Sequence, residues 1–222
     1  SMTYPNAAAG LKSIYQAKLV GLISIVLVII PIVQIFAVAA LLVAGFLALV
    51  GLYQCRKDDP GYNTAFMLVL ASFVINLLSN LLQAYFNAPA IIVTLISVVS
   101  DVLTLASLYY VCITTNRLLQ TIGTDTRTID RGVLVWRLNV ICTAILIVCE
   151  LLQAFSSDIA TVFAGFLAIF ALIAQLVGSI LYILYLLDAY RALQSAVPPE
   201  DRVRQMICLL YTSPSPRDRT RS

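Results

Sequence analysis

The sequence has no histidine, and only 11% of its 222 residues are charged. Without histidine there can be no HExxH zinc site and no catalytic pair of serine or cysteine with histidine. The five cysteines form neither a CxxC pair nor a metal-ligand spacing, so a zinc site or a disulfide framework is not expected. No P-loop and no GxGxxG motif occurs. We therefore expect no enzyme activity, no cofactor and no resident metal.

Hydrophobic residues, in contrast, make up 61% of the chain, and the mean hydropathy is +0.95. Soluble domains are about half apolar and about a quarter charged. A soluble fold of this size cannot bury so much apolar surface, whereas a lipid bilayer can cover it. The composition predicts an all-α integral membrane protein in contact with the lipid bilayer.

Turns and charged loops divide the apolar sequence into six stretches. The run from Lys18 to Tyr53 is too long for one crossing of about 30 Å at ~1.5 Å per residue, and Pro31 interrupts it. A six-span domain is predicted over residues 18–194, with a longest loop at 116–137 and with segments 1–17 and 195–207 outside the membrane. The predicted spans are about 18–33, 36–54, 64–86, 90–114, 138–155 and 159–187.

The positive charges are distributed unevenly between the two ends of these spans. Lys and Arg residues occur at the start of the first span, in the loops after the second and fourth, and after the sixth, but in none of the other three turns. The positive-inside rule then places both termini in the cytoplasm. We expect the cytoplasmic Lys and Arg residues to contact anionic lipid rather than nucleic acid. Asp188 is interpreted as an interfacial partner of Arg191, and four acids are interpreted as solvated loop charges: Asp58, Asp59, Asp125 and Asp130.

Both ends of the chain carry sequence that we interpret as non-native. The segment CLLYTSPSPRD, at 208–218, resembles the in-frame translation of a common transposase sequencing adaptor. Ser1 before Met2 resembles the scar left by tag removal. We expect residues 208–222 to be adaptor-derived, which is typical of environmental or draft genome sequence and favours a bacterial source and its inner membrane. The alternative is a genuine Ser/Pro/Arg-rich cytoplasmic tail.

The spans also pair into hairpins that resemble one another. NLLQAYF at 80–86 matches ELLQAFS at 150–156, and AVAALLVAGFLA at 37–48 resembles ATVFAGFLA at 160–168. We predict three tandem helical hairpins with a weak internal repeat, the alternative being chance similarity between Leu- and Ala-rich helices. The second match contains alanines at every fourth position, a spacing that favours close helix packing. These alanines are Ala40, Ala44, Ala48, Ala160, Ala164 and Ala168.

Polar side chains fall on one face of several predicted spans, at spacings of three and four along 72–83 and 94–107. Lipid penalises such groups, so these faces should contact protein or water. Asp101 lies near the middle of its span, where an ionised carboxylate costs about 2.5–3.5 kcal/mol. With no Lys or Arg inside a predicted span, it has to be protonated, hydrogen-bonded or hydrated. The candidates for transport or ion binding are Asp101, Glu150, Asn80, Gln83, Gln153 and Gln175.

Two functions remain open from the sequence. The first is a small transporter or channel with a polar intramembrane path centred on Asp101, which predicts a cavity that reaches this residue. The alternative is a non-catalytic membrane scaffold or interaction subunit whose polar faces only pack helices, which predicts a dry, closely packed interior. Homo-oligomerisation or membership of a larger complex fits either function, because the alanine stripes can pack within or between chains.

Overall fold

All secondary structure is helical in the residues that the computed structural model describes, which are 3–155, 158–198 and 207. The helices are α1 (Pro5–Val28), α2 (Gln34–Cys55), α3 (Gly61–Phe86), α4 (Ala90–Thr121), α5 (Thr126–Phe155) and α6 (Asp158–Ala196). All six are long and apolar enough to cross a membrane, by length and composition. The predicted all-α fold with six such helices is confirmed, and it indicates a membrane protein in contact with lipid. The predicted adaptor-derived segment and Ser1 lie outside the described residues.

The turns between paired helices follow from local sequence. Ile30, which precedes Pro31, adopts an extended backbone with φ −94° and ψ 112°, because proline disfavours helix in the residue before it. Helix α1 therefore ends at Val28, and a short 3₁₀ turn (Pro31–Val33) leads into α2. Helix α3 ends at Asn87, which adopts the left-handed conformation with φ 44° and is one of the few residue types that tolerate it.

Several helix boundaries differ from the sequence prediction, one of which is the end of α6 at Ala196 instead of about residue 187. Helix α1 begins at Pro5, so Lys18 lies well inside a helix rather than at its start. The prediction of a long loop over 116–137 is wrong, because α4 continues to Thr121 and α5 begins at Thr126. The physical reason is packing: Leu118, Leu119 and Val135 within this segment are buried in the core, and burial of an apolar face stabilises helix beyond the bilayer-length stretch.

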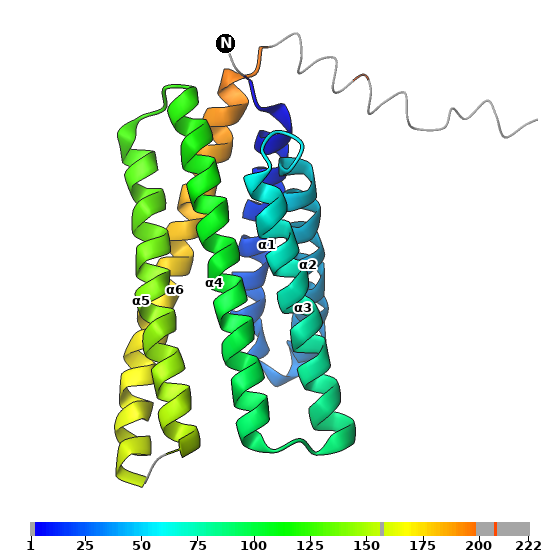
Figure 1. Ribbon diagram of the computed structural model, residues 1–222. Coiled ribbons are helices and arrows are strands. Elements are labelled where there is room, and N and C mark those ends of the chain that lie inside the picture. The colour runs from blue at the N-terminus through cyan, green and yellow to red at the C-terminus, as the bar shows by residue number, and fades with distance from the viewer. Residues whose placement is uncertain (1–2, 156–157, 199–206, 208–222) are drawn as a thin grey trace, which may run out of the picture.

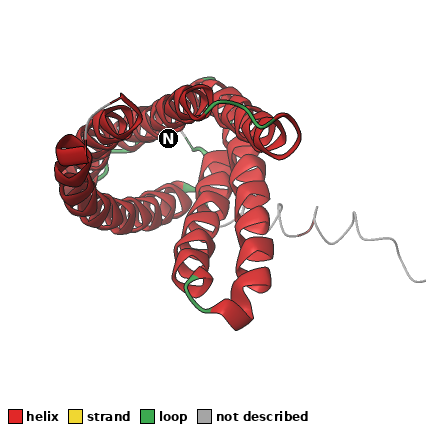
Figure 2. Ribbon diagram, turned by 90° about the horizontal axis from the view of Figure 1, so that it is seen from below, coloured by secondary structure: helices red, strands yellow, loops and turns green. Residues whose placement is uncertain are grey.

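The six helices form a ring. Helices α1 and α2, α3 and α4, and α5 and α6 pack as pairs, and the pairs meet through α2 with α3, α4 with α5, and α6 with α1 (Figure 1). Figure 2 shows the helices arranged around a common centre. The start of α1, the end of α6 and the loops after α2 and α4 lie together at one end of the bundle, at the top in Figure 1. We call this the terminal end.

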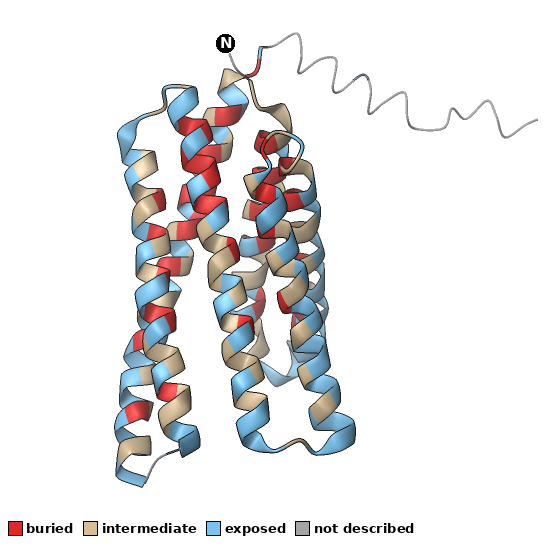
Figure 3. Cartoon of the chain, in the orientation of Figure 1, coloured by how far each residue is buried: buried red, intermediate tan, exposed pale blue. Residues whose placement is uncertain are grey.

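The packed core is concentrated at the terminal end. Buried residues gather there, whereas exposed residues predominate at the opposite end (Figure 3). Three tyrosines, Tyr62, Tyr182 and Tyr185, belong to this core together with Leu11 and Leu186. Two of the three hydroxyls are hydrogen-bonded inside it: Tyr62 bonds Thr115 Oγ1 at 2.7 Å, and Tyr185 donates to Asn116 Oδ1 at 2.6 Å. Apolar packing and satisfied hydrogen bonds therefore close the bundle at this end.

Asp58 and Asp59 are structural, so their interpretation as solvated loop charges is wrong. Helix α1 has no side-chain cap of its own. The Asp58 carboxylate supplies one from the loop after α2, accepting the backbone N–H of Ala7 at 2.7 Å. A carboxylate at a helix N-terminus satisfies a free donor and complements the helix dipole. Asp59 is buried and accepts a hydrogen bond from Arg117 Nη2 at 2.6 Å, which joins this loop to α4.

Asp188, Asp125 and Asp130 also lie at the terminal end, the first predicted to form an ion pair and the other two predicted to be solvated. Asp188 forms an ion pair as predicted, but its partner is Arg131 of α5 at 2.5 Å rather than Arg191. A partner on a neighbouring helix was not visible in the local sequence, because the pairing depends on how α5 packs on α6. Asp125 and Asp130 are exposed, in agreement with the prediction. The Asp125 carboxylate accepts the backbone N–H of Arg127 near the start of α5.

Helices α1 and α2 pack closely because glycines face each other. A Cβ atom added to Gly51 would lie 2.6 Å from the carbonyl oxygen of Gly10 and 2.7 Å from Cγ1 of Ile14. These distances are shorter than van der Waals contact, so the helix axes could not remain where they are. Close approach through small residues is a common way for membrane helices to pack.

We expect Gly51→Ala to lower the midpoint of thermal unfolding in detergent, because overpacking of this kind typically costs about 1–3 kcal/mol. The matched control is Gly45→Ala on the same helix, where an added Cβ would meet nothing within 4 Å. Both changes bring the same gain in helix propensity, so their difference measures the contact with α1. Equal midpoints for the two variants would contradict the close packing of α1 on α2.

Candidate functional site

A polar cavity of about 210 Å³ lies between α4, α5 and α6. Asp101 of α4 lines it, together with Glu150 of α5 and Gln175 of α6. Asn139 and Thr143 of α5 contribute further polar wall. The cavity therefore brings together three of the six polar candidates predicted from the sequence, each from a different helix.

The two carboxyl groups of this cavity have no cationic partner. Asp101 and Glu150 lie close enough to interact electrostatically with each other. Neither forms an ion pair or a hydrogen bond with any residue in the described ranges. The Glu150 Oε2 atom is buried and unpaired. A buried acceptor without a partner costs about 1–3 kcal/mol, so this arrangement is unfavourable for the bundle alone.

A second cavity of about 400 Å³ adjoins the first and is lined by all six helices. The two cavities share wall residues of α4, α5 and α6, among them Thr104, Asn139 and Gln175. Most of the remaining wall is apolar, and its one charged residue is Lys18 of α1. Tyr182 also lines this cavity and belongs to the core. The core at the terminal end therefore forms the floor of the cavity.

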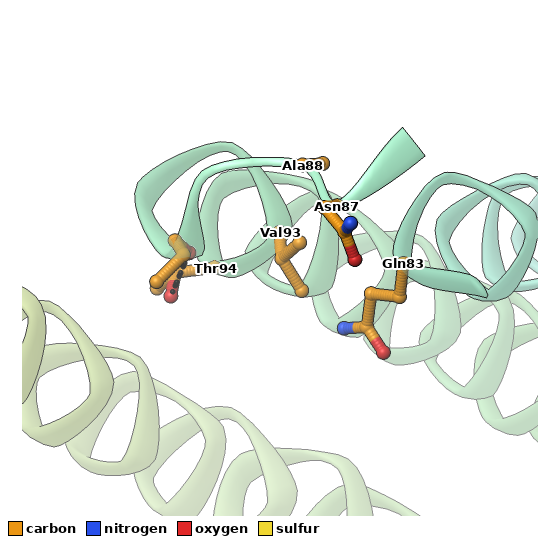
Figure 4. A pocket seen from close by; sticks show the side chains of 6 residues that line it. Gln83, Asn87, Ala88, Val93 and Thr94 are labelled. Carbon is orange, nitrogen blue, oxygen red and sulfur yellow. Dashed lines mark hydrogen bonds between the residues drawn. The ribbon is translucent and has the colours of Figure 1, made fainter. Parts of the chain in front are cut away.

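Three predicted candidates lie away from these cavities. Asn80 and Gln153 are exposed and line neither one. Gln83 instead lines an open depression at the α3–α4 turn, where its side chain lies near that of Asn87, and Thr94 lines the other side (Figure 4). The sequence pattern identified the polar face of α3, but it could not show which neighbour that face meets.

The polar face of α3 meets α4 through hydroxyl groups. Ser72 Oγ lies 3.1 Å from Ser100 Oγ and 3.1 Å from Thr104 Oγ1. These small side chains satisfy one another and hold the two helices together, as interhelical polar contacts in membranes do. Part of the polar pattern is therefore helix packing and not a pathway.

The two sets of alanines spaced four residues apart, on α2 and α6, show the same order of burial. Ala44 and Ala164, at the middle of each stripe, are buried, and the flanking alanines are half-buried. Ala44 also lies opposite Gly21, since a Cβ at Gly21 would be 4.0 Å from the Ala44 Cβ. The flanking positions are Ala40, Ala48, Ala160 and Ala168.

Lys18 is the functional candidate that the sequence analysis missed. It was assigned to the cytoplasmic edge of the first span because the preceding residues are less apolar. Pro5 was the available signal, since proline is favoured at the first position of a helix and would have moved the start of α1 thirteen residues upstream. Asn139 and Thr143, which line the smaller cavity, were also not among the predicted site residues.

Comparison with known proteins gives no family: no family model, curated protein or solved structure matches the chain. Within the described ranges, no three His, Cys, Asp or Glu side chains gather as metal ligands would. The functional argument therefore depends on the geometry of the two cavities.

We expect Glu150→Met to raise the thermal unfolding midpoint, because it replaces an unpaired buried acceptor by an apolar side chain of similar length. The gain should correspond to about 1–3 kcal/mol. Gln153→Met, at an exposed position on the same helix, is the control and should change the midpoint little. A lower midpoint for Glu150→Met would mean that the carboxyl group is bonded in the folded protein and holds helices together.

Proposed function

We propose that the chain is a small multi-pass transporter or channel of a bacterial inner membrane, with a polar path that passes Asp101 and Glu150. The observation that carries this proposal is the cavity between α4, α5 and α6, whose two carboxyl groups have no partner in the described residues. Ionisable residues inside membrane helices that face a cavity commonly bind ions or carry protons. We expect no catalytic role, since the cavities contain no nucleophile paired with a base.

The difference in packing along the bundle also supports transport. The tyrosine core closes the terminal end, and Tyr182 of that core lines the larger cavity. The opposite end has mostly exposed residues (Figure 3). A transporter that alternates between two sides of a membrane needs a closed end and an accessible site. In this proposal, the core with Tyr62, Tyr182 and Tyr185 is the closed gate of the conformation observed.

The topology follows from the charges. With the terminal end in the cytoplasm, the loops after α2 and α4 and both chain termini contact the inner leaflet, where their Lys and Arg residues meet anionic lipid. The contacts within α1–α2, α3–α4 and α5–α6 are those that three tandem hairpins would make. We propose that these hairpins arose as a weak internal repeat, in which Asp101 corresponds to Gln175 and both line the same cavity.

The second candidate function is a membrane scaffold or interaction subunit. The hydroxyl contact between Ser72 and Ser100 favours it, because these two polar residues pair between α3 and α4 and line neither cavity. The many exposed apolar side chains would then pack on lipid, on a second copy or on a larger complex. This function gives no reason for two adjacent carboxyl groups without partners.

Proteoliposome flux distinguishes the two functions. We expect purified wild-type protein to dissipate an imposed proton, Na⁺ or K⁺ gradient, followed with a trapped pH-sensitive or ion-sensitive dye. Asp101→Asn and Glu150→Gln should each lower the rate by more than about tenfold, because each removes an ionisable group from the path. Asp130→Asn, at an exposed position near the start of α5, should leave the rate unchanged. Negligible flux in all four proteins would exclude ion transport and favour the scaffold.

A further inference from the structure

Lys18 lies inside the ring and faces the larger cavity. Its side chain has accessible surface there, although it is far from both ends of α1. The nearest recorded partner is the Tyr182 ring, whose centroid is 5.9 Å from Nζ. In the described part of the chain, Lys18 has no ion pair and no hydrogen bond. This lysine is therefore a cation that the protein itself does not neutralise.

Among the described residues, none that lines this cavity carries a carboxyl group. Asp101 and Glu150 line the neighbouring cavity and not this one. An ammonium group taken out of water is costly unless an anion pairs with it. A cation–π contact of the Lys18 kind contributes about 0.5–2 kcal/mol, which does not replace a counter-ion. Lys18 is exposed within the cavity, so its ammonium group can meet either water or an anion from outside the chain.

We propose that the larger cavity binds a small organic anion, whose negative group pairs with Lys18 and whose apolar body fills the rest of the space. The inference deepens the proposed function and rests on it for the role of the site, because it names the class of molecule that would be carried. A volume of about 400 Å³ falls in the range of small-molecule sites, about 300–1,000 Å³.

The chemistry of the wall selects an organic anion over other ligands. Leu22, Leu49 and Phe73 supply apolar surface that an inorganic anion would leave uncovered. Since no acid lines the cavity, the positive group of a zwitterion would have no partner there. An anion that combines one negative group with an apolar body satisfies Lys18 and the apolar wall together.

Gln175 connects this site to the acids. It lines both cavities, and its amide has no hydrogen-bond partner in the described residues. Its amide NH₂ can donate either to a bound anion or to a carboxyl group. Ser179 of the same helix is a further hydroxyl on the wall of the larger cavity. The bound anion and the carboxyl groups of Asp101 and Glu150 would therefore compete for hydrogen bonds from the Gln175 amide.

Binding to purified protein in lipid nanodiscs tests the site without requiring transport. The probes are radiolabelled benzoate, hexanoate and indole-3-acetate, each compared with its uncharged amide by equilibrium dialysis. We expect at least one anion to bind at a single site and more tightly than its amide. Lys18→Gln should weaken binding of that anion by more than about tenfold, and Lys18→Arg should retain most of it.

Lys12→Gln is the matched control, because Lys12 is a lysine of the same helix that lines neither cavity. It should leave binding unchanged. Thermal unfolding midpoints of all variants identify a loss of binding that is caused by misfolding. The comparison of each anion with its amide needs only wild-type protein, so it does not depend on how the variants fold. Equal binding of every anion and its amide, or undiminished binding in folded Lys18→Gln, would overturn the proposal.

The binding experiment and the flux experiment test separate claims, so either claim can be contradicted while the other is supported. Anion binding that depends on Lys18, without flux of protons or cations, would support the site and remove the proposed coupling through Asp101. Flux that depends on Asp101, without preference for any anion over its amide, would support the transporter and overturn the anion site.

Discussion

Polar side chains inside an apolar helical bundle need partners, and the two halves of this bundle meet that requirement differently. At the terminal end several polar groups are paired across helices: Tyr185 with Asn116, Asp59 with Arg117, and Asp188 with Arg131. In the middle of the ring, Asp101, Glu150 and Lys18 have no such partners and face cavities instead. Since both regions belong to one fold, the unpaired groups mark the part of the molecule where stability has been given up. Sites of that kind are where binding or proton transfer takes place.

The ring explains how the cavities coexist with a stable fold. Small residues allow neighbouring helices to approach closely, as Gly10 and Gly51 do between α1 and α2, and contact between α1 and α6 closes the circle. Helices held in a ring cannot all meet at the centre, so space remains there unless large side chains fill it. At the terminal end tyrosines fill it. Further along, the same central position is occupied by cavities whose walls come from every helix.

The sequence predicted where the helices lie along the chain better than it predicted which neighbours their polar faces meet. Apolar run length, Pro31 and Asn87 were sufficient for six helices and for the turns between paired helices, because these are local effects. Asp101, Glu150 and Gln175 were chosen from their position inside apolar sequence, and the structure brings them to one cavity. Asn80 was chosen for the same reason, but it is exposed and lines neither cavity. Periodicity defines a face of a helix, but the rotation of that face towards a neighbour depends on the packing of the whole ring. The burial of Asp59 and the cavity position of Lys18 required that long-range information.

Water access to the middle of the ring tests the central claim most directly. In a chain whose five cysteines are replaced by alanine, Gln175→Cys and Ile173→Cys can be labelled in liposomes with a charged, membrane-impermeant methanethiosulfonate reagent. Position 175 lines both cavities, whereas position 173 is exposed on an apolar surface and is not part of either wall. Because the thiolate is the nucleophile that attacks the reagent, and a thiolate forms readily only where water reaches it, we expect much faster labelling at 175 than at 173. Equally slow labelling at both positions would mean a dry interior and would contradict a polar path through this protein.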